Sequence, residues 1–247
     1  MNTSTSAGHA LWVLAHPERD SLNAALRDAG VAALRSQGWQ VTESDLYAMG
    51  WEPTLVRPGG ADVAAEQAKL LVADLVVLQF PLWWYGQPAI LKGWIDRVFE
   101  SGFGYDVVDP QTGRVRKYGD GLLTGKRALA VVTAGDRPGS LQPRGISGSI
   151  EDVLWPLLHG TFWYTGMLPL HPELITKARD LDVGQFTALR DRLVDRLAGV
   201  QSEVPIGYLP LDDDHYDHAV QLHDHIAPGE QGIAAHRDVR VPEPCLR

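Results

Sequence analysis

The chain has 247 residues, of which 45% are hydrophobic and 21% are charged, and its formal net charge is −9. This composition is ordinary for a globular protein with a sizeable core, and the length allows one large domain or at most two small ones. The acidic balance argues against a nucleic-acid binder, because neutralising phosphates requires clustered Lys and Arg. A single cysteine, Cys245, excludes a disulfide within the chain and is typical of proteins in a reducing cytoplasm, where we expect this one.

The beginning of the sequence contains no targeting or membrane-spanning pattern. Residues 1–8 are rich in Ser and Thr and are expected to form a disordered lead-in. The apolar run over residues 10–15 is too short for a secretion signal or a membrane span. A membrane partner is therefore not expected.

Apolar runs and amphipathic segments alternate along the chain. Continuous apolar runs predict strands buried on both faces, and apolar residues at helical spacing predict the helices between them. The predicted strands cover residues 11–15, 39–47, 73–80, 126–134 and 168–175. The predicted helices cover residues 22–37, 61–72, 87–100, 148–160 (interrupted or bent at Pro156) and 183–200. Residues 101–125 are Gly-rich and polar, which predicts an excursion with room for a hairpin.

This alternation predicts an α/β fold, a doubly wound five-stranded parallel sheet with helices on both faces. We expect residues 1–204 to form this domain and residues 205–247 to form a polar C-terminal extension. Ligands bind such sheets at the carboxyl ends of the strands, where the strand order reverses. We therefore expect the ligand to bind at the loops over residues 15–21, 80–88 and 133–147.

The loop after the first predicted strand ends at a helix N-terminus. Its sequence, AHPERDSLN, has neither a GxGxxG nor a Walker A pattern, so it indicates no Rossmann or nucleoside triphosphate site. Free backbone N–H groups and the positive end of the helix dipole attract a phosphate at such a position. His16, Ser21 and Asn23 add side-chain donors, although Ser21 could equally act as a helix cap alone.

The loop after the third predicted strand, FPLWWYGQP, carries three adjacent large aromatic residues. A core helix would space such residues three or four apart, whereas Pro81 and Gly86 place these on a loop. A flat heterocycle needs aromatic faces to pack on and backbone amides to bond its edge. We expect Gly86 to allow the tight turn. The alternative is a hydrophobic plug or a protein interface, where Trp and Tyr are also enriched.

Around these loops the chain resembles the NAD(P)H:quinone oxidoreductases, the DT-diaphorase-like branch of the flavodoxin-like fold. The resemblance runs from residue 11 to residue 166, and its most specific segments are residues 15–23, 38–53, 65–105 and 145–160. It implies a flavin prosthetic group, FAD rather than FMN, and a homodimer with active sites at the subunit interface. It also implies ping-pong, two-electron reduction of quinones by NAD(P)H.

The resemblance also implies site residues, position by position. The pyrophosphate-binding segment matches His16, Ser21, Leu22 and Asn23. The two segments along the flavin ring match Pro81, Leu82, Trp83, Trp84 and Tyr85, and Thr133, Ala134, Gly135 and Asp136. Substrate contacts match Trp84, Tyr85, Tyr105, Leu141 and Tyr164, with Tyr105 closing over the substrate.

The chain departs from the family pattern beside the flavin ring. Leu141 and Ser147 stand where the mammalian-type enzymes have a tyrosine and a histidine that take up charge from the reduced flavin, and Asp136 replaces a glycine. We therefore expect Tyr105 to orient or protonate the acceptor, and solvent or Ser147 to complete the proton balance. Backbone N–H groups around Gly135 and Ser147 are expected to stabilise developing negative charge.

These residues leave three functions open. They are a quinone reductase, a flavin-dependent reductase of azo, nitro or biosynthetic aromatic compounds, and a flavin-bearing regulatory subunit of a membrane transport system. The His- and Asp-rich residues 212–225 have no closed four-ligand spacing, so no metal site is predicted. In the resembled family this region crosses to the partner subunit, so we expect the C-terminal extension at a dimer interface.

Overall fold

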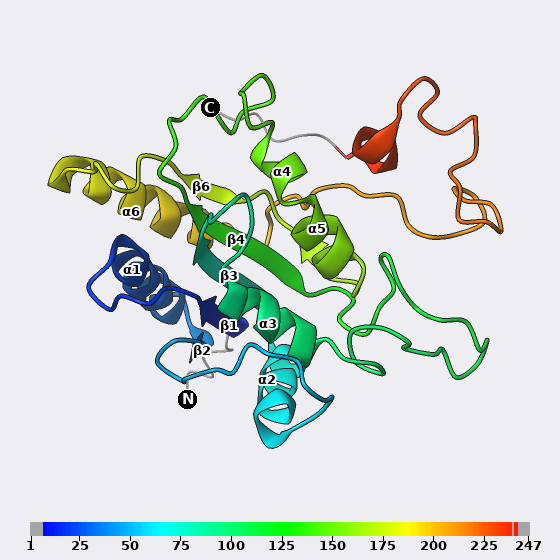
Figure 1. The fold of residues 1–247 in the computed structure, drawn as a ribbon, viewed down its shortest axis with the longest axis horizontal. Coiled ribbons are helices and arrows are strands. Elements are labelled where there is room, and N and C mark those ends of the chain that lie inside the picture. Colours follow the sequence, from blue (N-terminus) through cyan, green and yellow to red (C-terminus); the bar gives the residue numbers. More distant parts are fainter. Residues whose placement is uncertain (1–6, 239, 242–247) are drawn as a thin grey trace, which may run out of the picture.

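The computed structural model describes residues 7–238 and 240–241, and it has a central sheet between layers of helices (Figure 1). The strands are β1 (Gly8–Leu14), β2 (Trp39–Asp45), β3 (Leu75–Pro81), β4 (Arg127–Thr133), β5 (Leu168–Pro169) and β6 (Glu173–Ile175). The helices are α1 (Leu22–Ser36), α2 (Ala61–Val72), α3 (Ala89–Val98), α4 (Ile150–Val153), α5 (Trp155–Leu157) and α6 (Val183–Ala198). A π-helix, η1 (Leu158–Trp163), and a 3₁₀ helix, η2 (Gly232–His236), complete the described elements.

The strands pair in parallel in the order β2-β1-β3-β4-β5, and β6 also pairs with β4. The order reverses between β1 and β3, as it does in flavodoxin-like folds, and the predicted doubly wound α/β fold is confirmed. Gly8 pairs with Trp39, so β1 begins earlier than predicted and Gly8 is not part of a disordered lead-in. Residues 1–6 of that predicted lead-in lie outside the described residues.

The two faces of the sheet bury alternate residues of each strand. Leu11 and Val13 of β1 pack with the layer formed by α2, α3 and α5, together with η1. Ala10 and Trp12 pack with α1 and α6 on the other face. Because side chains alternate across a strand and both faces are covered, these strands appear in the sequence as continuous apolar runs.

The predicted fifth strand is wrong in detail, whereas the predicted interruption of the helix at Pro156 is confirmed. The fifth strand is split into β5 and β6, because Pro169 and Pro172 lack the N–H group that a continuous ladder requires. The helix predicted over residues 148–160 is broken into α4 and α5 next to Pro156, and the chain continues past Gly160 as η1. Both breaks reshape the edge of the sheet near β4.

The excursion over residues 101–125 contains the hairpin that the sequence had room for. Val108 and Val115 form an antiparallel bridge, and the backbone N–H of Arg116 donates to Val107 O at 2.7 Å. Asp109 closes the turn, because its carboxylate accepts hydrogen bonds from the backbone of two following residues. This hairpin projects away from the sheet (Figure 1).

The described part of the C-terminal extension packs against its own chain beside α5 (Figure 1). Tyr208 and Leu209 are buried, and Trp163 Nε1 donates to Leu209 O at 3.3 Å. Arg237 bonds Glu151 at 2.5 Å, so it joins the extension to α4. The placement of the extension at a dimer interface stays a prediction. Within the described residues, no helix has both the length and the apolar character to cross a membrane.

An aromatic cluster lies where the extension meets η1. His159 stacks on Trp155 with ring centroids 4.1 Å apart, and Tyr208 meets both rings edge-on. Burial, and secondly the neighbouring His236, lowers the pKa of His159 to about 4. His159 is therefore neutral at physiological pH.

The depressed pKa of His159 makes stability depend on pH. In the unfolded chain this imidazole takes up a proton below its ordinary pKa of about 6.5, whereas the folded state resists protonation down to about 4. Stability should therefore fall as the pH falls through this window, by about 1 kcal/mol per pH unit for this group. We expect His159→Phe to flatten this part of the slope in urea unfolding measured at pH 6.5, 5.5 and 4.5, conditions chosen from that window. The exposed control His218→Phe should keep the wild-type slope, and an unchanged slope in His159→Phe would contradict the assignment.

Candidate functional site

Three loops meet at the carboxyl ends of β1, β3 and β4. Asn23 Nδ2, in the first turn of α1, donates to Thr133 Oγ1 at the end of β4 over 2.9 Å. The backbone N–H of Leu82, just after β3, donates to Thr133 O at 2.8 Å. The structure therefore joins Asn23, Leu82 and Thr133, one from each predicted binding segment, at the point where the strand order reverses.

Gln79 of β3 holds this junction together, and the sequence analysis missed it. Its side chain is fully buried, its Nε2 donates to Asn23 O at 2.7 Å, and its Oε1 accepts from Trp12 Nε1 at 2.8 Å. A buried amide needs such partners. The available signal was one polar residue inside the otherwise apolar strand LVVLQFP.

The first loop presents a helix N-terminus, as predicted. Ser21 is the N-cap of α1, and its Oγ accepts from Ala24 N at 3.2 Å while donating to Glu18 O at 2.8 Å. The Ser21 hydroxyl is thus occupied within the loop. The backbone N–H groups of Leu22 and Asn23, in the first turn, have no acceptor within the helix and remain for an anion.

Two adjacent hollows flank this helix N-terminus. One has a volume of about 490 Å³ and the other about 410 Å³, and both are lined by Arg19 and Ala24. His16 and Arg27 line only the larger one. The two arginines were not among the predicted site residues, although Arg19 lies within the AHPERDSLN segment. Arg27 is ion-paired with Asp28 and Glu43, and acidic residues also line both hollows, so Arg19 is the arginine that adds positive charge beside the helix N-terminus.

The aromatic loop forms a tight turn with unusual backbone angles. Trp83 and Gly86 exchange backbone hydrogen bonds of 3.0 and 3.1 Å, and the φ angles of Trp84 and Tyr85 are +50° and +62°. Positive φ at both central residues defines a type I′ turn, so the unusual angles lie at the aromatic residues and not at Gly86 as expected. Bulky residues rarely adopt such angles, and strain of this kind concentrates at functional sites.

The turn directs aromatic surface outward. Trp84 is 96% exposed, and Tyr85 is 54% exposed. The backbone N–H groups of these two residues donate to no acceptor among the described residues. The turn therefore offers both an aromatic face and free amides to a ligand.

Tyr85 is connected to the loop that precedes α4. Its Oη lies 3.2 Å from Ser147 Oγ, so two predicted site residues come together. The Ser147 N–H donates to Ser140 O at 3.0 Å and is not free to stabilise negative charge, contrary to expectation. Leu141, which like Ser147 departs from the family pattern, is only 1% exposed, so its side chain offers an acceptor almost no surface to contact.

The loop after β4 is held at both ends and open in the middle. Ala134 N donates to Ile175 O at 2.8 Å, and Lys177 N donates to Asp136 O at 2.9 Å. Gly135 between them is exposed, and its N–H donates to no acceptor among the described residues. This N–H is the one that remains for the charge stabilisation expected of this loop.

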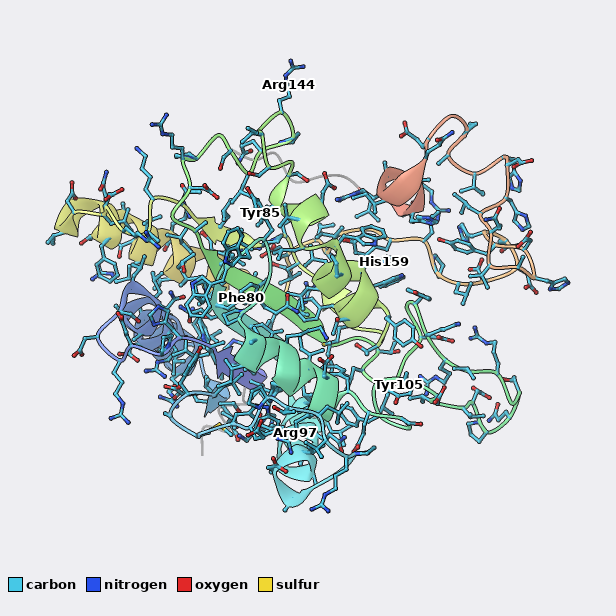
Figure 2. The ribbon with its side chains drawn as sticks, viewed as in Figure 1. Phe80, Tyr85, Arg97, Tyr105, Arg144 and His159 are labelled. Carbon is cyan, nitrogen blue, oxygen red and sulfur yellow. The ribbon has the colours of Figure 1, made fainter. Side chains whose placement is uncertain are left out.

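Tyr105 lies apart from the Tyr85–Ser147 pair, and Tyr164 makes its ring contact with Tyr118. Figure 2 shows Tyr105 on the projecting 101–125 segment, well away from Tyr85. Tyr164 packs edge-on against Tyr118 at 4.9 Å, and burial, with smaller effects of Tyr118 and Asp106, raises its pKa. One chain therefore does not bring every predicted site residue together. Among the described residues, no three His, Cys, Asp or Glu side chains gather into a metal-binding group.

The arrangement suits one kind of ligand in particular. The helix N-terminus with Arg19 nearby suits a phosphate group. The exposed aromatic turn, with its own free backbone amides, suits a flat ring system. The ring and phosphate positions both lie at the edge of the sheet where the strand order reverses. A nucleotide-like ligand with a planar head would use both.

Comparisons with known proteins agree with this geometry. Residues 8–197 match the family model described as flavodoxin-like fold. A ribosyldihydronicotinamide dehydrogenase-like protein of Penicillium crustosum is 38% identical over 83% of this chain and 86% of its own length. The NAD(P)H dehydrogenase [quinone] 1 of Rattus norvegicus is 34% identical over 81% of this chain and 80% of its own. A solved structure from Klebsiella pneumoniae, assigned as a quinone reductase, has a TM-score of 0.89 and 37% identity, and covers 94% of this chain and 100% of its own. The chain therefore belongs to the NAD(P)H dehydrogenase (quinone) family of flavodoxin-like proteins.

Proposed function

We propose that this protein is an FAD-dependent NAD(P)H oxidoreductase that reduces quinones or related electron-poor aromatic acceptors by two electrons in a ping-pong reaction. The observation that carries this proposal is the exposed Trp84–Tyr85 turn beside the open Gly135 loop, at the carboxyl edge of the sheet. The names of the related proteins support it, since they are NAD(P)H or ribosyldihydronicotinamide dehydrogenases that act on quinones.

The residues present fit a flavin dinucleotide. The first turn of α1 and Arg19 would hold the pyrophosphate, while the Trp84–Tyr85 turn and Gly135 would flank the ring. The two adjacent hollows beside α1 support FAD over FMN, because a dinucleotide extends further past the helix N-terminus than a mononucleotide does. When bound, the flavin supplies the capacity to accept two electrons from a reduced nicotinamide and to pass them to an acceptor.

The chain's own residues would then position the acceptor and manage its proton. Tyr85 Oη and Ser147 Oγ form a hydroxyl pair at the edge of the ring position, and either can donate one hydrogen bond. Neither can carry a full positive charge as a histidine does. The proposal therefore assigns the Tyr85–Ser147 pair to orientation and assigns proton donation to Tyr105 or solvent.

A homodimer in the cytoplasm is part of this proposal. Trp84 and Ile146 are 96% and 97% exposed, so a single chain leaves large apolar side chains around the site uncovered. Tyr105 projects away from Tyr85 on its own chain (Figure 2). A second copy that covers the site and inserts its Tyr105 would complete it and would remove these side chains from water.

The decisive experiment identifies the chromophore. The purified protein should be yellow, and heat release followed by chromatography should yield FAD. A panel of quinone, azo and nitro acceptors under NADH and NADPH should then show fast turnover with quinones. A colourless protein that binds neither FAD nor FMN would overturn the proposal. Bound flavin with negligible turnover for every acceptor would favour the regulatory-subunit alternative instead.

Removing the Tyr105 hydroxyl should slow the proton-coupled reaction. We expect Tyr105→Phe to lower kcat/KM for quinones about tenfold, the effect of losing one hydrogen bond of about 1.4 kcal/mol in the transition state. Steady-state kinetics should show the loss mainly in kcat. Ferricyanide takes up an electron without a proton, so its reduction by the variant should match the wild type. Unchanged kcat/KM for every quinone would remove Tyr105 from the mechanism.

A further inference from the structure

The C-terminal extension, α5 and η1 line a further, partly open cavity, distinct from the two hollows beside α1. Its volume is about 360 Å³. Its walls are formed by aromatic and apolar side chains, namely Tyr118, Trp155, His159, Leu209, Leu211, Tyr216, Val220, Gly232, Ile233 and His236. It shares no residue with the set assigned to the flavin or the acceptor. Figure 2 shows His159 beside the extension.

Flat rings from separate segments adjoin in the cavity wall, because His236 lies 6.3 Å from Trp155 and 6.4 Å from His159 between ring centroids. On the side of α5 and η1, Trp155 and His159 stack with an interplanar angle of 11°. On the extension side, Tyr216 and His236 stack at 9°, and a 2.9 Å contact between Tyr216 Oη and His236 Nδ1 holds them. A wall made of adjoining aromatic rings favours a planar guest, because aromatic faces pack well on other flat surfaces.

The lining carries no permanent charge. It contains no Asp, Glu, Lys or Arg, and burial lowers the pKa of both His159 and His236, so both imidazoles are neutral at physiological pH. Moving a charged ligand from water into this cavity would carry a desolvation penalty, and the lining has no opposite charge to offset it. The cavity therefore selects against ions.

His159 offers a free polar group in this wall. The His159 ring contacts other rings but makes no hydrogen bond with the described residues, whereas His236 Nδ1 is engaged by Tyr216. A neutral imidazole has one donor and one acceptor nitrogen. A guest that carries a hydroxyl or a carbonyl would satisfy His159 without needing a charge.

A strained turn lies beside the cavity. Val220 has a φ of +62°, which a β-branched residue rarely adopts. Asp217 holds the turn, because its Oδ1 accepts from Ala219 N and Gln221 N, both at 2.9 Å. The strain is thus retained by specific bonds at the lining residue Val220, as is common at ligand-binding segments.

We propose that this cavity is a binding site for an uncharged, flat aromatic molecule of about two fused rings that carries a hydroxyl or carbonyl group. The volume lies in the lower range of small-molecule pockets, which suits a guest of naphthol size. Tyr118 connects the site to the proposed acceptor wall, since it lines the cavity and also packs against Tyr164. The site does not depend on the flavin.

Calorimetry with 2-naphthol and 2-naphthoate tests this proposal on the full chain, with and without added FAD. We expect saturable binding of 2-naphthol in both conditions and binding of the anionic naphthoate at least tenfold weaker. Ile233→Trp, which fills the cavity from η2, should weaken naphthol binding at least tenfold while flavin content and turnover stay at wild-type levels. Trp84→Ala should leave the naphthol affinity unchanged. Absence of saturable binding, equal affinity for the two probes, or wild-type affinity in Ile233→Trp would overturn the proposal.

Photolabelling locates the site without relying on a variant that has to fold. An azide-bearing naphthol, crosslinked to the wild-type protein and mapped by peptide mass spectrometry, should label residues 155–164 or 206–238. Excess 2-naphthol should suppress this labelling. Label confined to residues 81–86 would show that the aromatic turn is the only site and would overturn the proposal.

Discussion

Gly135→Val is expected to lose its flavin while keeping its fold. Gly135 lies in an exposed part of the loop after β4, and a Cβ built on it would meet only Arg179 Nε, at 3.9 Å. Its φ lies outside the left-handed region, so valine introduces no backbone strain. The proposed ring position, however, needs close approach to the bare backbone of this loop, and two added methyl groups would hold the ring away from it.

We expect the flavin-to-protein ratio of this variant, measured by absorbance after dialysis, to fall at least tenfold, which corresponds to about 1.4 kcal/mol or more of binding free energy. Its thermal unfolding without flavin should match that of the wild-type apoprotein. Gly139→Val is the matched control, because it lies in the same segment with no atom within 4 Å of its Cβ position. Full flavin content in Gly135→Val would place the ring elsewhere.

Glu66→Leu should cause the largest loss of stability. Glu66 on α2 is 1% exposed, and its Oε2 accepts from Ser44 Oγ at 2.8 Å and from Trp94 Nε1 at 2.9 Å. Its Oε1 pairs with Lys69 Nζ at 2.5 Å. Leucine would leave these donors without their acceptor beneath the sheet, and removing one partner of a buried, hydrogen-bonded pair costs about 3 kcal/mol or more.

Urea unfolding at neutral pH measures this loss directly. Asp96→Leu is the control, because Asp96 pairs with Lys92 on the exposed side of α3 and such pairs contribute less than about 1 kcal/mol. A double variant, Glu66→Leu with Lys69→Met, should recover part of the loss, since it also removes the ammonium group that Glu66→Leu leaves without its carboxylate. If Glu66→Leu lowered the free energy of unfolding no more than Asp96→Leu does, the buried hydrogen bonds of Glu66 would not be a source of stability.

The sequence by itself determined the architecture and pointed to the loops that form the candidate site. Apolar runs such as residues 73–80 alternate with amphipathic segments such as residues 183–200. This periodicity involves neighbouring residues only, so it can be recognised without knowing the fold. Topology rules then place the loops after β1, β3 and β4 at one edge of the sheet. The aromatic residues Trp83–Tyr85 and the motif before Asn23 were identifiable for the same reason, because each is contiguous in the chain.

Only the tertiary structure decided which side chains meet. Gln79 bonds Trp12 and Asn23 across 67 and 56 residues, and no local pattern specifies partners at such separations. The structure joined Tyr85 to Ser147 but left Tyr105 on a separate projection, which accords with the expectation that the site is completed by a second copy. The cavity under the C-terminal extension depends in the same way on segments far apart in sequence. Periodicity is a property of neighbouring residues, whereas hydrogen-bond partners, buried charge and cavities are properties of packing, and packing exists only once the chain has folded.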